Sequence, residues 1–217
     1  MKKSIGHSEK VAGIAQLTRA ALGFRAHSGW VAVVAVAGDT RSPKVVGRSR
    51  VELASLEIPR PVQPYHAAQK MELKKAEAHI ARFAEEARNF AAKAMRDVVQ
   101  ELRIQGYQVV SCGIVSGSGR PAPTVKAALA SHPLLHTAEG ELFRNAIIQA
   151  SRQCRLAVLQ IKERELFARG VKELGLPLGG LQFILDKIGE PLGPPWGQDQ
   201  KLASLMAWLA LSGNETR

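Results

Sequence analysis

Two kinds of hydrophobic pattern alternate along this chain of 217 residues. Trp30–Ala37 is an unbroken apolar run rich in β-branched residues, which predicts a buried central strand. Turn residues follow it, and Lys44–Leu53 then mixes apolar with charged positions, so the two segments together predict a β-hairpin. Leu56–Ile58 is a candidate for a short third strand, after which three closely spaced prolines end regular structure.

A long helical segment comes next. From about His66 to Arg103 the chain contains neither proline nor glycine, and apolar residues recur every three or four positions. Such a helix is far longer than average, so we expect either a break near its start or a projecting helix that packs on a partner. Gly106 is expected to end it, and Tyr107–Val115 predicts a second buried strand.

The C-terminal half continues the alternation of strands and helices. Ser116–Arg120 is a Gly/Ser loop between the second buried strand and a short helix at 124–130. Because Pro133 argues against an earlier start, Thr137 is the predicted N-cap of a helix over 138–152, with two Glu in its first turn. A third buried strand is predicted over 155–161, followed by helices at about 163–174, 178–188 and 199–211.

The domain organisation follows from the absence of internal repeats and linkers. We expect residues 1–27 to be an N-terminal arm, ordered or carrying a short helix, and residues 28–217 to be a single α/β domain. The composition, 46% hydrophobic and 23% charged, suits an ordinary soluble core. Cys112 and Cys154 lack the spacing of metal ligands, so we expect two buried free thiols.

The charge is strongly basic, with Lys and Arg exceeding Asp and Glu by 11. Residues 1–50 carry nine of the basic side chains and only two acids. This excess favours an anionic partner such as nucleic acid or a phosphorylated ligand, against the alternative of a simple solubility bias. No apolar run is long enough to cross a bilayer or to form a secretory leader, so we expect a cytoplasmic protein without a membrane partner.

The order of these elements resembles the RNase H-like fold, in which an antiparallel meander is followed by alternating helices and strands. The last helix, Asp199–Leu211, is similar to the final helix of RuvC-type resolvases, where an acid precedes small apolar residues. The resemblance covers about residues 28–212 and implies a mixed sheet flanked by helices, with Trp30–Ala37 and Tyr107–Val115 as parallel neighbours. The chain is also compatible with an uncharacterised bacterial family.

The resemblance implies phosphodiester hydrolysis by two metal ions held on three or four carboxylates. One acid is expected in the first strand and another at the end of the strand after the long helix. Trp30–Ala37 and Tyr107–Val115 contain no acid, and only Asp199 matches an expected position. The resemblance therefore implies the fold, whereas the standard nuclease mechanism is expected to be absent.

The densest group of reactive side chains lies between residues 131 and 144. In the fold implied by the resemblance, this segment, the Gly/Ser loop and the start of the last helix open onto one cleft. Its candidate catalytic residues are His136, Glu139 and Asp199. Its candidate ligand contacts are Ser116, Ser118, Arg120, His132, Glu141 and Arg144. No metal ligand is assigned and no cofactor is named.

Several interpretations of this group stand side by side. On a continuous helix the spacing of His132, His136 and Glu139 would suit zinc, whereas a His paired with Glu would suit acid–base chemistry. The alternative is a purely structural role, in which both His cap or tether the loop through hydrogen bonds. The Gly/Ser loop likewise either binds a phosphate or merely connects two elements.

Two functions are therefore expected from the sequence. The first is a nucleic-acid or phosphate-binding protein on an RNase H-like scaffold, with a basic cleft but without the standard nuclease carboxylates. The second is a non-catalytic interaction protein that uses the long helix 66–103 to bind a partner or to form a homodimer. The sequence leaves open whether the protein is an enzyme.

Overall fold

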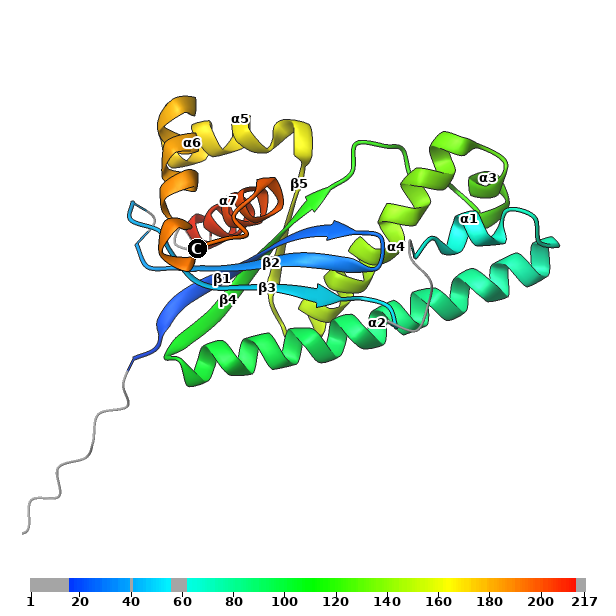
Figure 1. Ribbon diagram of the computed structural model, residues 1–217, viewed down its shortest axis with the longest axis horizontal. Coiled ribbons are helices and arrows are strands. Elements are labelled where there is room, and N and C mark those ends of the chain that lie inside the picture. Colours follow the sequence, from blue (N-terminus) through cyan, green and yellow to red (C-terminus); the bar gives the residue numbers. More distant parts are fainter. Residues whose placement is uncertain (1–15, 40, 56–61, 214–217) are drawn as a thin grey trace, which may run out of the picture.

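The computed structural model describes residues 16–39, 41–55 and 62–213. Five strands form one mixed sheet in the order β3-β2-β1-β4-β5 (Figure 1). β1 (Thr18–His27) pairs antiparallel with β2 (Trp30–Ala37), which pairs antiparallel with β3 (Lys44–Glu52). On its other side β1 pairs parallel with β4 (Tyr107–Ser116), which pairs parallel with β5 (Ala157–Lys162). The predicted mixed sheet and its hairpin are confirmed.

The central strand is β1, and this corrects two predictions. The segment 18–27 is not part of an N-terminal arm, and Trp30–Ala37 is not a neighbour of β4, because β1 lies between them. Its apolar stretch is short, contains a glycine and is bracketed by Arg19 and Arg25, so its pattern does not resemble that of a buried strand. The candidate strand Leu56–Ile58 and most of the predicted arm lie outside the described residues.

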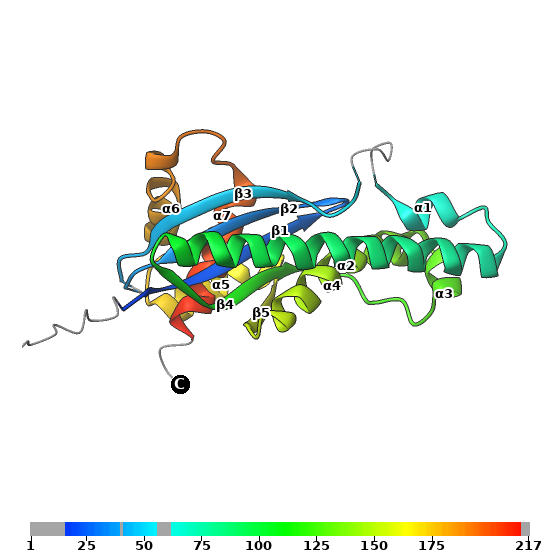
Figure 2. The ribbon, with the colours of Figure 1, turned by 90° about the horizontal axis from the view of Figure 1, so that it is seen from below.

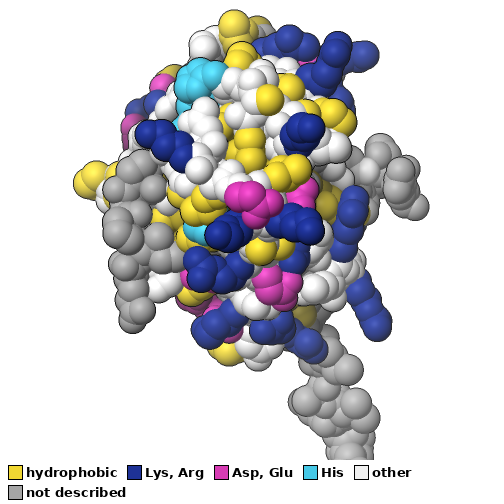
Figure 3. All heavy atoms as spheres, turned by 90° about the vertical axis from the view of Figure 1, so that its right-hand side faces the viewer, with side chains coloured by type: hydrophobic (Ala, Val, Ile, Leu, Met, Phe, Trp, Pro, Cys, Tyr) yellow, Lys and Arg dark blue, Asp and Glu magenta, His cyan; other side chains and the backbone are white. Residues whose placement is uncertain are grey.

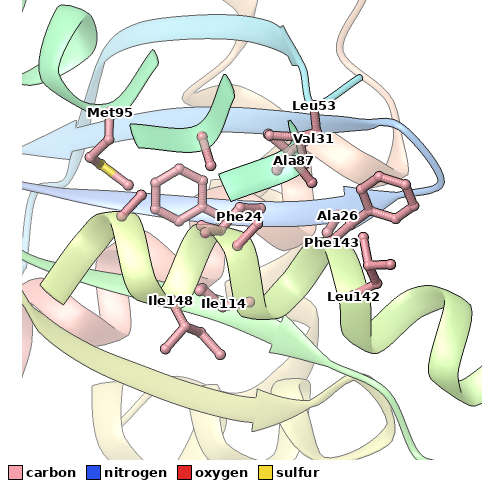
Figure 4. Close-up of a cluster of buried hydrophobic side chains, with 14 of the residues drawn as sticks. Phe24, Ala26, Val31, Leu53, Ala87, Met95, Ile114, Leu142, Phe143 and Ile148 are labelled. Carbon is pink, nitrogen blue, oxygen red and sulfur yellow. The ribbon is translucent and has the colours of Figure 1, made fainter. Parts of the chain in front are cut away.

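One face of the sheet is covered by two long helices. α2 (Leu73–Ile104) runs along this face (Figure 2), and α1 (Pro64–Ala68) precedes it, so the expected break near the start of the helix is confirmed. α4 (His132–Gln153) packs beside α2, with α3 (Val125–Leu129) before it. The core between helices and sheet is built from side chains such as Phe24, Met95 and Phe143 (Figure 4).

The opposite face is covered by the last three α-helices, α5 (Glu163–Leu174), α6 (Leu178–Lys187) and α7 (Gln198–Ser212), with a 3-10 turn, η1 (Glu190–Leu192), between the last two. α7 is buried along most of its length and lies directly on β1 and β4. A Cβ atom at Gly113 would lie 2.5 Å from the carbonyl oxygen of Met206, and one at Gly23 would overlap that of Ala203. This close approach places the first turn of α7 above the end of β1.

The start of α4 differs from the prediction. The helix begins at His132, with Pro133 in its first turn, where a proline is tolerated because the N–H it lacks would have no partner within the helix. The hydroxyl of Thr137 donates a hydrogen bond to the carbonyl of Pro133, 3.0 Å away, inside the helix. Thr137 is therefore not an N-cap, and neither Glu139 nor Glu141 lies in the first turn.

Two further expectations concern the thiols and membrane spans. Cys112 is buried and Cys154 half-buried, and both are free. Burial raises the pKa of the Cys112 thiol to about 11, so it is unreactive at neutral pH. Among the described residues no helix is long and apolar enough to cross a bilayer.

Candidate functional site

The structure distributes the reactive side chains over two separate groups. The Asp199 group consists of Arg25, His27, Glu163 and Asp199. The histidine–Glu139 group consists of His66, His132, His136 and Glu139. Asp199, which sequence reasoning placed with His136 and Glu139, has its close contacts in the first group instead.

The Asp199 group forms where three elements meet. Arg25 and His27 lie two residues apart on β1 and therefore project from the same face of the sheet, the face that α7 covers. His27 Nε2 lies 2.9 Å from Asp199 Oδ1, in the first turn of α7. Arg25 Nη2 lies 2.9 Å from Glu163 Oε2, at the start of α5, and its Nε lies 4.0 Å from Asp199 Oδ1.

A stack of planar groups supports His27 from the side. The rings of His27 and Trp30 are parallel within 9° and their centroids are 4.2 Å apart. The guanidinium carbon of Arg50 lies 4.0 Å from the centroid of the Trp30 ring. Because β2 lies between β1 and β3, Trp30 separates the other two, and the stack orients the imidazole toward Asp199.

The residues of this group do not fit a pair of metal ions. The true first strand, β1, contains no Asp or Glu, and neither does β4. In place of the acid that the resemblance implies, β1 contributes Arg25 and His27, whose positive or hydrogen-bonding groups already contact the carboxylates of Glu163 and Asp199. A two-metal centre needs more carboxylates and no cation among its ligands.

The histidine–Glu139 group depends on the early start of α4. With a continuous helix, His132 and His136 are four residues apart on one side, and their Nε2 atoms are 3.0 Å apart. α1 adds His66, whose ring centroid lies 4.8 Å from that of His136. Sequence reasoning missed His66 because it lies 66 residues before His132, and nothing in the local pattern marks it.

Glu139 is the buried acid of the group, with 3% of its surface exposed. Its Oε2 accepts a hydrogen bond from the backbone N–H of Tyr65 at 3.1 Å and lies 3.4 Å from His66 Nδ1. Its Oε1 has no hydrogen-bond partner among the described residues. Burial raises the pKa of Glu139 to about 7, although backbone hydrogen bonds from Tyr65 and His66 oppose the shift. The imidazole that Glu139 contacts is thus His66, whereas the sequence hypothesis paired it with His136.

The Gly/Ser loop after β4 lies against Arg144 of α4. Arg144 is buried and its Nη2 lies 2.8 Å from Glu141 Oε1. A Cβ atom at Gly117 would lie 2.9 Å from Arg144 Nη2, and one at Gly140 would lie 2.7 Å from its Nη1, so both glycines make room for the guanidinium. The structure therefore places this loop against α4. Ser116 is the last residue of β4, and Ser118 and Arg120 lie in the segment between β4 and α3.

A cavity of about 390 Å³ opens beside Glu141, between α2, α3 and α4. Its polar lining residues are Tyr65, Arg88, Thr124, Glu141, Asn145 and Gln149. Figure 3 looks onto this end of the molecule and shows histidine side chains among scattered Lys and Arg. Within the described part of the chain, no group of three or more His, Cys, Asp or Glu side chains is arranged to hold a metal ion.

Comparisons with known proteins identify the fold. No protein-family model and no curated protein matches the sequence. The structure is similar to Thermus thermophilus RuvC in complex with a Holliday junction substrate, with a TM-score of 0.53, 8% sequence identity and coverage of 91% of this chain and 96% of that one. A second Thermus thermophilus RuvC structure matches with a TM-score of 0.51, 9% identity and coverage of 87% and 90%. The RNase H-like fold in its RuvC arrangement is therefore confirmed.

Proposed function

We propose that this protein binds nucleic acid on an RNase H-like scaffold and does not cleave it by the two-metal mechanism. The observation that carries the proposal is the Asp199 group, in which Arg25 and His27 occupy the strand from which the fold's nuclease chemistry would take an acid. Because Glu163 and Asp199 are already paired with Arg25 and His27, their carboxylates are not free to hold the metal ions that this hydrolysis needs. The RNase H-like scaffold and an excess of 11 positive charges still favour a polyanionic partner.

The similarity to RuvC supports this choice of partner, since one of the two similar structures is a complex with a Holliday junction. The proposed phosphate contacts are the loop residues Ser116, Ser118 and Arg120, together with His132 and Arg144 around the adjoining end of α4. Glu141 has the supporting role of holding Arg144 through their ion pair. Glu139 and His66, whose Oε2 and Nδ1 atoms lie 3.4 Å apart, are the proposed acid–base pair of this surface, with His136 beside them. A phosphorylated small ligand would use the same contacts.

The purified protein is expected to bind a four-way junction, duplex or single-stranded DNA or RNA, measured by fluorescence anisotropy, with an affinity that falls steeply as salt rises. No Mg²⁺- or Mn²⁺-dependent cleavage of these substrates is expected. Asp199→Asn is the matched variant, because it keeps the shape of a side chain that the nuclease mechanism would need. Cleavage by the wild type that Asp199→Asn abolishes would contradict the proposal.

A second function, association through the long helix, is favoured by apolar side chains on or beside α2. Met71, Leu73, Phe90 and Ile104 are exposed, Ile104 by 77%. They are spread singly from residue 71 to residue 104, whereas an interaction surface is marked by a contiguous apolar patch, so this function is the weaker of the two. If anisotropy detects no nucleic-acid binding at low salt, and sedimentation detects a dimer that Phe90→Ser and Ile104→Ser dissociate, this second function replaces the first.

A further inference from the structure

Two exposed histidines meet on the first two turns of α4. His132 and His136 are both exposed, yet their side chains converge until the Nε2 atoms are 3.0 Å apart. Water can satisfy either ring nitrogen at such a position, and a hydrogen bond between two solvent-exposed groups adds little net stability. The pairing also restricts the rotamers of both side chains. The folded chain thus has little to gain from this arrangement unless a third species joins it.

A metal ion satisfies both nitrogens at once. Imidazole nitrogens bind transition metals at about 2.0–2.1 Å, so two ligands on one ion lie roughly 3 Å apart when the angle between them is near 90–110°. The observed separation of 3.0 Å between the two Nε2 atoms matches this geometry. The spacing of four residues on a helix is also the spacing that brings two His ligands to one face.

The neighbours of the pair suit a cation. The buried carboxyl of Glu139 lies on the same helix, one turn beyond His136, with its Oε2 3.4 Å from His66 Nδ1. The ring of His66 lies edge-on to that of His136, with a centroid separation of 4.8 Å. No third side chain among the described His, Cys, Asp and Glu is already arranged around the same point, so solvent or a bound ligand would complete the coordination.

We propose that His132 and His136 form a two-histidine binding site for a divalent transition-metal ion, of the class of Zn²⁺, Ni²⁺ or Cu²⁺. Imidazole ligands favour these ions over Mg²⁺ and Ca²⁺, which prefer oxygen. The site is distinct from the Asp199 group, but it shares His132 and His136 with the surface proposed to bind nucleic acid. A metal ion held there would therefore take the place of the direct contacts proposed for these two imidazoles. Its two protein ligands leave coordination positions open, as sites that bind an exchangeable ligand do.

The test is isothermal titration of the full chain, freed of metal, with Zn²⁺ and separately with Ni²⁺. One site is expected, and His132→Ala or His136→Ala should each weaken binding by at least about tenfold, because one of two protein bonds to the ion is lost. Mg²⁺ should not compete. Cu²⁺ bound to the wild type should show nitrogen couplings from two imidazoles by electron paramagnetic resonance, and from one in either variant.

His79→Ala is the matched control, since His79 lies on α2 beside Phe83 and outside the cluster. It should leave the affinity unchanged, and circular dichroism should show that all three variants keep the wild-type fold. The proposal is overturned if Zn²⁺ and Ni²⁺ do not bind the wild type, if both single variants of the pair bind as tightly as the wild type, or if His79→Ala weakens binding as much as they do.

Discussion

Gly23→Ala is expected to destabilise the protein by more than about 3 kcal/mol, a large part of the roughly 5–15 kcal/mol by which single domains are typically stable. Gly23 lies on the face of β1 that α7 covers. A Cβ atom there would overlap the carbonyl oxygen of Ala203 and lie 2.7 Å from the backbone nitrogen of Ala207. Both are helix backbone atoms, so the clash cannot be relieved by a side-chain rotation and must push α7 off the sheet.

Gly47→Ala is the control for this change, because Gly47 is also a strand glycine. There a Cβ atom would meet only side chains of Ala35 and Leu102 at ordinary distances of 3.6 and 3.7 Å. Urea denaturation of both variants, followed by circular dichroism, measures the difference in the free energy of unfolding. If Gly23→Ala is within about 1 kcal/mol of the wild type, α7 does not pack on β1 as closely as described.

The same contact explains why the sequence predicted most of the fold but not its central strand. Trp30–Ala37 can be recognised from its unbroken apolar run, and α2 from apolar residues that recur every three or four positions. Both patterns lie within the segment itself. β1 is buried mainly because a helix some 180 residues later lies on its small residues. The sequence near β1 contains no sign of that distant helix. Because Arg19 and Arg25 flank the short apolar stretch, the segment has the composition of a polar surface segment.

The candidate site was predictable to a similar degree. The clustering of His132, His136 and Glu139 is visible in the sequence because the three lie within eight residues. Their partner His66 is not, since the contact that joins α1 to Glu139 spans 74 residues between Tyr65 and Glu139. Arg25 and His27 were likewise hidden, because the pairing of His27 with Asp199 spans 172 residues.

Glu139→Gln is expected to change how stability depends on pH. The pKa of Glu139 in the folded protein is about 7 against an ordinary value of 4.5, because burial disfavours the charged form. Below the ordinary value both the folded and the unfolded chain hold the proton, and the carboxyl costs nothing. As pH rises from about 4.5 to about 7 the unfolded chain releases the proton first, so the folded state loses stability, by about 3 kcal/mol in all. Above that range both states are ionised and the loss is constant.

Glutamine keeps an oxygen acceptor for the backbone N–H of Tyr65 but has no proton to release, so the variant escapes this loss. Urea denaturation at several pH values from 4 to 8 should therefore show the stability of Glu139→Gln rising relative to the wild type by about 3 kcal/mol across that range. Glu85→Gln, which removes a carboxyl group whose side chain is 60% exposed, reports what the loss of a surface carboxylate does by itself. If the difference in the free energy of unfolding between Glu139→Gln and the wild type does not change with pH, Glu139 has the same pKa in the folded and the unfolded chain, which contradicts the prediction.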